Sequence, residues 1–291
     1  MKPSRFDYHA PKDLAEALDL MGELGEDATP LAGGQSLVPM MNLRMAQPFA
    51  LVDLNDVPDL AYVRREDDAL AIGAMTRHRV AEHSPEVARD APLIAVAERH
   101  VAYPVIRARG TVGGSVAHAD PSAELSCVLI ATDASVVLAS TSGRRELRAE
   151  EYFAGPYMTH REPEELLVEL RVPLAPPDTR FAFGEMARKA GDFALVLVAV
   201  ALTMQDERCV RARVAVGGAG SVPVRAHAAE QALDGRQPTT ALIADAARAA
   251  AQEVDVNGDA HGSAAYRRRL VEVEVRRALE RAATNAQEDV S

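Results

Sequence analysis

The sequence has few metal-binding residues and no excess of positive charge. It contains two cysteines, Cys127 and Cys209, far apart in apolar surroundings, and no C-x-x-C motif. We therefore expect no zinc or iron–sulfur ligation within this chain, and two buried thiols in a reducing cytoplasm. Lys and Arg number 32 against 43 Asp and Glu, which leaves a net charge of −11. This balance argues against a general binder of nucleic acid or of anionic membranes.

Long apolar runs are also missing. The longest, at 193–204, is too short and too rich in β-forming residues to span a bilayer. The N-terminal segment M-K-P-S-R-F-D-Y-H-A lacks the apolar core of a secretory signal, so we expect a cytoplasmic protein. The apolar fraction of 48% and the charged fraction of 26% are ordinary for a globular protein.

The chain does contain two glycine-rich loops. One reads L-A-G-G-Q-S-L at 31–37, and the other reads R-G-T-V-G-G-S at 109–115. Glycine lets a ligand approach the main chain, and neighbouring N–H groups can converge on an anion. Each loop alone is weak evidence, because a Gly-Gly pair before a helix is more often a tight turn. Neither loop has Rossmann or Walker spacing. Together they predict one large ligand held from two sides.

The expected strands and helices indicate an α+β protein in two parts. Residues 1–57 and 58–175 form two N-terminal subdomains, in which Thr76 and Ser84 are candidate N-caps of helices at 77–82 and 86–101. Prolines at 173, 176 and 177 then make the best linker in the chain. Beyond it, three strands precede three helices. The strands are expected at 181–188, 193–204 and 209–216, and the helices at 225–233, 239–254 and 263–284.

Several segments together resemble one family. The chain is closely similar to the FAD-binding medium subunit of molybdenum hydroxylases, a family that includes the flavoprotein subunit of carbon monoxide dehydrogenase and the flavin domain of xanthine dehydrogenase. The similarity lies in A-G-G-Q-S-L-V-P-M-M-N-L-R (32–44), I-R-A-R-G-T-V-G-G-S-V-A-H-A-D-P-S-A-E-L (106–125), A-R-K-A-G-D-F-A-L-V (187–196), A-V-G-G-A-G-S-V-P-V-R-A (215–226) and H-G-S-A-A-Y-R-R-R-L (261–270). It covers nearly the whole chain.

The resemblance implies a fold and a role. The fold is a two-part FAD-binding domain of the vanillyl-alcohol-oxidase/PCMH type at 1–175. A C-terminal flavoprotein-like domain at 178–288 adds a three-stranded antiparallel sheet with helices. FAD would accept electrons from [2Fe–2S] clusters of a small subunit and pass them to an external acceptor, while a large molybdopterin subunit oxidises the substrate. Such subunits assemble as dimers of heterotrimers, which can lie at the inner face of the membrane. No catalytic side chain is expected on this chain.

The resemblance also assigns residues to FAD. The pyrophosphate would be held by main-chain N–H groups of 32–36 and 111–115 and by the hydroxyls of Ser36 and Thr111. The full cofactor-binding set in the two loops is Ala32, Gly33, Gly34, Gln35, Ser36, Leu37, Thr111, Gly113, Gly114, Ser115 and Ala117. Glu124 matches an acidic position near the adenosine ribose. Asp192 and Phe193 match the approach to the isoalloxazine. Lys189 either adds charge near the flavin or is a solvated strand-end lysine.

Some features have other interpretations. Ala108 stands where the family usually has asparagine, so one polar contact before the second loop is missing. The pair His118 and Asp120 suggests a metal or acid–base site, but two ligands are too few for a metal, and the family places them in the FAD loop. Two alternatives to an electron-transfer subunit remain open. One is a stand-alone FAD oxidase or reductase, and the other is a flavin-free assembly scaffold.

Overall fold

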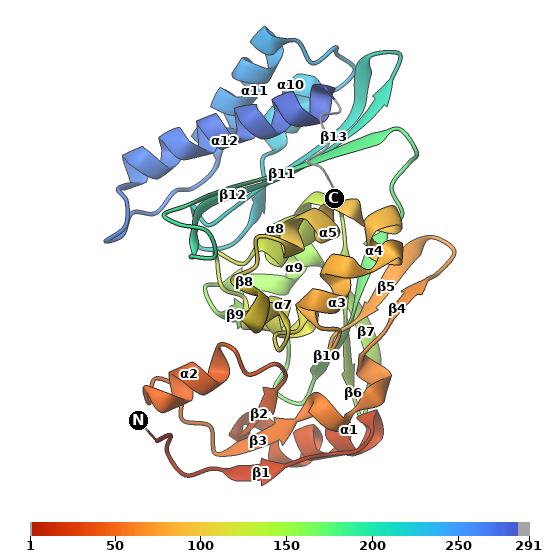
Figure 1. Cartoon of the computed structure of the whole chain (residues 1–291), viewed down its shortest axis with the longest axis vertical. Helices are drawn as coiled ribbons and strands as arrows, with labels where there is room; N and C mark the ends of the chain where they lie inside the picture. Colours follow the sequence, from red (N-terminus) through yellow and green to blue (C-terminus); the bar gives the residue numbers. More distant parts are fainter. Residues whose placement is uncertain (1, 285–291) are drawn as a thin grey trace.

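The N-terminal part is a small parallel sheet at one end of the molecule (Figure 1). The computed structural model describes residues 2–284. The strand order is β1-β3-β2, with bounds β1 (Asp7–His9), β2 (Ala28–Leu31) and β3 (Ala50–Asp53). Helix α1 (Leu14–Leu24) begins after Asp13, whose carboxylate accepts the Glu16 N–H at 2.9 Å, and it ends at Gly25 with φ +54°. Helix α2 (Leu37–Asn42) follows the first glycine loop.

The middle part is a five-stranded antiparallel sheet with most helices of this region packed against it. The strand order is β4-β5-β10-β6-β7. The strands are β4 (Val63–Arg65), β5 (Ala69–Gly73), β6 (Ser135–Ser140), β7 (Gly143–Arg148) and β10 (Leu166–Pro173), with a small pair β8 (Phe153–Gly155) and β9 (Met158–Thr159) beside them. The helices are α3 (His78–His83), α4 (Pro85–Asp90), α5 (Pro92–Glu98), α6 (Pro104–Arg107), α7 (Val112–His118), α8 (Glu124–Ala131) and α9 (Ala149–Tyr152).

The C-terminal part is a four-stranded antiparallel sheet covered by helices on its outer face (Figure 1). Three long strands carry it, and the two-residue β14 adds a fourth. The bounds are β11 (Thr179–Ala187), β12 (Ala194–Gln205), β13 (Arg208–Gly217), β14 (Val224–Arg225), α10 (His227–Leu233), α11 (Thr240–Glu253) and α12 (Ala264–Thr284). The predicted end of this part, at 288, lies outside the described residues.

The long apolar run of the sequence is the central strand β12. Residues 194–202 are buried along their whole length, because the inner face of the sheet packs on α5 and α8 and the outer face on α10–α12. A strand covered on both faces reads as a continuous apolar stretch instead of an alternating one. Among residues 2–284, no helix is both long enough and apolar enough to cross a bilayer.

The helix predicted at 86–101 is two helices. Ser84 caps the first, α4, by accepting the Val87 N–H at 3.2 Å, as predicted. The chain then breaks at Ala91, and Pro92 begins α5. Thr76 is not a cap, because its hydroxyl donates to the Tyr62 carbonyl at 2.9 Å. Proline fits the first turn of a helix but not its interior, which explains the break.

Candidate cofactor-binding site

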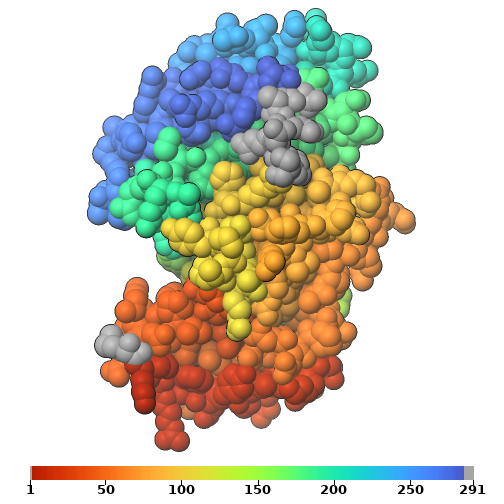
Figure 2. Space-filling model, in the orientation of Figure 1, coloured from red at the N-terminus to blue at the C-terminus, as the bar shows by residue number. Residues whose placement is uncertain are grey.

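The two glycine loops meet in the fold. We call residues 32–37 and 109–115 the glycine clamp. A Cβ built on Gly33 would lie 2.4 Å from the Arg109 carbonyl oxygen and 2.6 Å from the Gly110 Cα. Figure 2 shows the surface indented at its left edge, between the orange segment that contains α2 and the parts above it. The predicted juxtaposition of the loops is therefore present in the fold, and only glycine fits at their contact.

The first loop presents main-chain donors that the protein does not use. Gly34 adopts φ +71°, which turns the chain sharply. The Val38 N–H bonds to the Gly34 carbonyl at 3.1 Å, whereas the N–H groups of residues 34–37 have no acceptor within residues 2–284. Ser36 is exposed, and its hydroxyl does not cap α2, which leaves this hydroxyl available to a ligand. This loop can therefore donate several hydrogen bonds to an anion.

Most N–H groups of the second loop are already bonded within the protein. Gly113 donates to the Ala74 carbonyl at 2.9 Å, and Gly114 donates to the Thr111 hydroxyl at 3.1 Å. Val112 and Ser115 bond to the carbonyls of Thr76 and Thr111. Thr111 is thus the buried N-cap of α7. This geometry favours the first loop as the source of main-chain N–H donors for a ligand. The second loop packs closely against the first loop.

Glycines in the second loop permit this packing. A Cβ on Gly113 would lie 2.4 Å from the Ala74 Cβ, and one on Gly114 would lie 2.7 Å from the Thr111 hydroxyl and 3.3 Å from the Ala32 Cβ. Ser115 is half-buried and Ala117 is exposed on α7. All of the loop residues assigned from the sequence therefore lie at or beside the clamp.

Glu124 begins α8 in a partly buried acidic environment. Burial raises the pKa of its carboxyl to about 7, and the nearby carboxylates of Glu185 and Glu98 add to the increase. The charge of His78 opposes this increase in the pKa of Glu124. The Nδ1 of His78 lies 2.8 Å from the Glu98 carboxylate, to which it is hydrogen-bonded. A carboxyl of this kind is able to act as donor or acceptor towards a sugar hydroxyl near neutral pH.

The turn between β11 and β12 carries the remaining predicted residues. Lys189 and Phe193 are exposed, Phe193 by 72%. Asp192 accepts from the Arg188 guanidinium at 3.1 Å and from the Phe193 N–H at 3.1 Å. Gly191, at φ +73°, lies against Tyr103, where a Cβ would approach the ring to 2.9 Å.

A pocket of about 290 Å³ joins this turn to the loop after α7. Its walls include Asp120, Asp192 and Phe193. Asp120 accepts from the Tyr157 hydroxyl at 3.2 Å and from the Ser122 N–H at 2.9 Å, and the His118 ring packs 5.1 Å from the Tyr157 ring. His118 and Asp120 therefore contact other parts of the protein. Within the described part of the chain, no group of three or more His, Cys, Asp or Glu side chains could hold a metal.

The side chains of Asn55 and Arg77 form a polar bridge between the two loops, which was not predicted from the sequence. Asn55 donates to the Ala32 carbonyl at 2.9 Å and accepts from Arg77 at 2.7 Å. The same guanidinium also donates to the Arg109 carbonyl. Asn55 follows β3 and Arg77 precedes α3, and no local sequence motif marks either residue. Only the fold brings them together.

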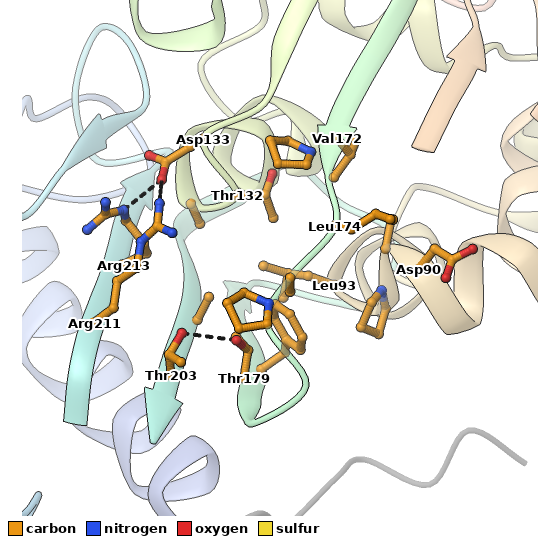
Figure 3. A pocket seen from close by; sticks show the side chains of 18 residues that line it. Asp90, Leu93, Thr132, Asp133, Val172, Leu174, Thr179, Thr203, Arg211 and Arg213 are labelled. Atoms are coloured by element: carbon orange, nitrogen blue, oxygen red, sulfur yellow. Dashed lines mark hydrogen bonds and ion pairs between the residues drawn. The ribbon is translucent and has the colours of Figure 1, made fainter. Parts of the chain in front are cut away.

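A second hollow lies on a different side of the middle part, where α8 meets the C-terminal sheet (Figure 3). It has a volume of about 60 Å³. Its polar groups are paired with one another. Asp133 accepts from Arg211 at 2.5 Å and from Arg213 at 2.8 Å, and the hydroxyls of Thr179 and Thr203 are 3.0 Å apart. Because it is small and these groups are bonded, it is a weaker ligand site than the clamp.

Comparison with known proteins decides the family. Residues 4–175 match the model of the FAD binding domain in molybdopterin dehydrogenase, and residues 181–282 match that of the CO dehydrogenase flavoprotein C-terminal domain. This chain belongs to the FAD-binding medium-subunit family of molybdenum hydroxylases. The resemblance and the fold class predicted from the sequence are confirmed.

Relatives of this medium subunit match it along nearly its whole length. It is 42% identical over 97% of its length to subunit alpha of the 6-hydroxypseudooxynicotine dehydrogenase complex of Paenarthrobacter nicotinovorans, covering 96% of that protein. It is 39% identical to the carbon monoxide dehydrogenase medium chain of Hydrogenophaga pseudoflava, over 96% of this chain and 97% of that one.

Solved structures give the same result. A carbon monoxide dehydrogenase chain from Hydrogenophaga pseudoflava superposes with a TM-score of 0.95 at 41% identity, over 98% of this chain and 99% of that chain. A chain of quinoline 2-oxidoreductase from Pseudomonas putida 86 gives 0.94 at 36% identity, with the same coverage.

The residues of the medium subunit fit a bound FAD. The free N–H groups at 34–37 suit a pyrophosphate, and the exposed Ser36 hydroxyl adds a donor beside them. The Glu124 carboxyl suits a sugar hydroxyl, and the exposed ring of Phe193 suits an aromatic face. A Cβ at either Gly33 or Gly114 would disturb the clamp.

Proposed function

We propose that this medium subunit holds FAD in the glycine clamp and relays electrons within a molybdenum hydroxylase. The observation that carries the proposal is the row of unused N–H groups at 34–37, held against Gly110 by a contact that admits only glycine. FAD supplies the redox chemistry, because it exchanges electrons one or two at a time. The chain supplies its position, its electrostatics and its shielding from water.

Individual residues have defined parts in this proposal. Gly34 to Leu37 donate to the pyrophosphate, and Thr111 keeps the second loop in place by capping α7. Glu124 bonds the ribose, and the turn carrying Asp192 and Phe193 approaches the isoalloxazine. Lys189, exposed on that turn, adds positive charge near the ring. None of these side chains needs to act as a nucleophile or as a general acid or base on a substrate.

The wider complex is part of this proposal, and membership of the family supports it. The electrons come from [2Fe–2S] clusters on a small subunit, and the substrate is oxidised on a large molybdopterin subunit. An external acceptor takes the electrons from FAD, and two heterotrimers pair. Both cysteines of this chain are buried, and burial raises the pKa of Cys127 to about 12 and that of Cys209 to about 11. We expect the complex in the cytoplasm, either free or at the inner face of the membrane.

Spectroscopy of the purified full-length chain tests the proposal. After incubation with FAD and gel filtration, the chain should show flavin absorption at roughly 370 and 450 nm. Acid precipitation should release the colour into the supernatant, whereas colour that stays with the protein would favour a covalent stand-alone oxidase. Gly114→Val should lose the flavin, because its side chain meets Thr111 and Ala32. A wild-type chain that takes up no FAD, or normal flavin occupancy in Gly114→Val, would contradict the assignment.

A further inference from the structure

The polar bridge behind the glycine clamp connects the two loops at the carbonyls beside their contact. Asn55 Nδ2 holds the Ala32 carbonyl, next to Gly33, at 2.9 Å. Arg77 Nη1 holds the Arg109 carbonyl, next to Gly110. The two side chains bond to each other through Arg77 Nη2 and Asn55 Oδ1 at 2.7 Å. One continuous path of hydrogen bonds thus spans the point where Gly33 and Gly110 touch.

The bridge is itself held in place at both ends. The Asn55 N–H donates to Asp53 Oδ1 at 3.0 Å, and the other oxygen of Asp53 accepts from the Tyr8 hydroxyl at 2.6 Å. At the other end, Arg77 directly precedes α3 and pairs with Thr111 through a β-bridge. The bridge therefore joins β1 and β3 of the N-terminal sheet to the start of α3 and to the second loop.

One side of the bridge faces a cleft, so packed side chains do not hold the two loops together there. Asn55 and Arg77 both line a cleft of about 800 Å³ between residues 55–63 and α3. Burial and the neighbouring Arg109 lower the pKa of Arg77, so the protein keeps two guanidinium groups close together at a cost. The Asp53 carboxylate acts in the opposite direction and offsets part of this repulsion, so Arg77 is held at the clamp by its hydrogen bonds and by the charge of Asp53 together.

We propose that Arg77 and Asn55 are positioning residues for FAD, which fix the spacing of the two loops and thereby set the affinity for the pyrophosphate without touching it. This inference rests on the proposed FAD site. It assigns the two side chains no part in the redox step. A clamp with the wrong spacing would present the N–H groups of 34–37 out of register with the phosphate oxygens, and such displacement weakens binding.

A double-mutant cycle on the full chain tests the inference, with FAD itself as the probe. The dissociation constant and release rate of FAD are measured by flavin fluorescence for Arg77→Met, Asn55→Ala and the double variant. The melting temperature of each apo-protein is recorded in parallel. Each single change should raise the dissociation constant by about 10- to 100-fold, the scale of a lost charge-assisted hydrogen bond. The dissociation constant of the double variant should be no higher than that of the single variant that binds FAD less tightly, because both changes break the same bridge.

Two further variants separate this role from others. Arg79→Met removes an exposed arginine of α3 that lines the same cleft but is outside the bridge, and it should bind FAD as wild type does. Arg77→Lys keeps the charge, but its single ammonium cannot reproduce the two-pronged geometry, so its affinity should fall between wild type and Arg77→Met. If Arg77→Met does not fold, Arg77→Lys and Asn55→Ala decide the question.

The outcomes distinguish the inference from the proposed function. Non-additive losses with a normal Arg79→Met support the bridge. Wild-type affinity in Arg77→Lys or in Asn55→Ala, additive losses, or an equal loss in Arg79→Met would overturn it and leave the FAD site intact. A wild-type chain with no affinity for FAD would overturn the proposed function itself.

Discussion

The two seams of this protein differ in how their polar groups are arranged. The seam between the N-terminal and middle parts has an apolar cluster, in which Met21 of α1 packs with Leu166 of β10, and it also has the glycine clamp, where the backbones touch at Gly33 and Gly110 and the side chains of Asn55 and Arg77 connect the two loops. The seam between the middle part and the C-terminal sheet is an apolar core, in which Leu125 of α8 and Leu197 of β12 belong to one buried cluster.

Polar groups differ between the seams as well. At the second seam, Asp133 accepts from three arginines, Arg211, Arg213 and Arg225, at 2.5 to 2.8 Å. At the clamp, the N–H groups of 34–37 remain without acceptors among the described residues. A seam with its polar groups paired is complete in the protein alone, whereas a seam with unused donors is completed by a ligand. The difference therefore supports the proposal that FAD binds at the first seam, whereas the second seam joins two parts of the chain without a ligand.

The largest effect is expected from a single methyl group at the clamp. In Gly33→Ala, the new Cβ would lie 2.4 Å from a backbone oxygen that cannot move aside by side-chain rotation. The loops must separate, which should cost about 2–3 kcal/mol of FAD binding, or roughly a 100-fold weaker affinity. Flavin fluorescence titration of the full chain measures it.

The matched control is Gly22→Ala in α1. Its Cβ would have ordinary contacts, 3.8 Å from Thr141. It should leave FAD affinity unchanged and raise stability by about 0.5–1 kcal/mol, since alanine suits a helix interior better than glycine does. Equal FAD affinity in both variants would contradict the close contact as a determinant of the site.

A medium effect is expected at Glu124, because its pKa of about 7 lies above the ordinary glutamate value of 4.5. Between these values the folded apo-protein keeps a proton that the unfolded chain has lost, so stability should fall as pH rises through this window. Glu124→Gln should remove that slope and be more stable than wild type above pH 7, by roughly 2 kcal/mol, because the carboxyl is partly exposed and solvent screens part of the shift. Urea unfolding of the apo-protein from pH 5 to pH 8 measures both curves.

The exposed Glu23 on α1 provides the control for this prediction. In Glu23→Gln, stability should change with pH as it does in the wild type, because Glu98, Glu185 and His78 act on the carboxyl of Glu124 and not on that of Glu23. A wild-type stability that does not change between pH 5 and pH 7 would refute the partly buried acidic environment.

How much of the site was visible in the sequence depends on how local each feature is. The glycine loops and the Ser84 cap are local, and the structure has them where the sequence predicts. Thr111 illustrates an intermediate case, because a threonine before a helix is also a cap signal, and the hydroxyl assigned to FAD proves to be bonded to Gly114. The strands of the C-terminal sheet were also predictable, since their apolar runs are long.

Other features are not local. The bridge joins Arg77 to Asn55 and Arg109, which are 22 and 32 positions away in the chain, and no pattern of residue types encodes that meeting. The break before Pro92 was missed because the apolar spacing continues across it, although a proline at the first turn of a new helix predicts such a break. Long-range polar pairs and helix junctions therefore required the fold.

The smallest effect is expected at the second seam, and it has the opposite dependence on pH. Burial acts to raise the pKa of Asp133, but its hydrogen bond to Arg213 and the charges of Arg213, Arg225 and Arg211 outweigh burial. They hold the pKa below the ordinary aspartate value of 3.8. Its contribution to stability is therefore complete above that value and is lost as pH falls through the lower, folded-state pKa.

Asp133→Asn should cost about 1–2 kcal/mol at neutral pH, because the carboxyl is one-third exposed and solvent screens the pairs. Asparagine tolerates the positive φ of +53° at this position, so the backbone should not be strained. The difference from wild type should shrink below pH 4, while FAD affinity at pH 7 stays within about twofold. Urea unfolding at several pH values measures the stability difference, and fluorescence titration measures the FAD affinity.

The control variant is Asp245→Asn, which breaks an exposed pair with Arg248 and should cost less than about 0.5 kcal/mol of stability. If Asp133→Asn instead weakened FAD binding as much as Gly33→Ala does, the two seams would be one coupled unit, and their separate roles would have to be abandoned.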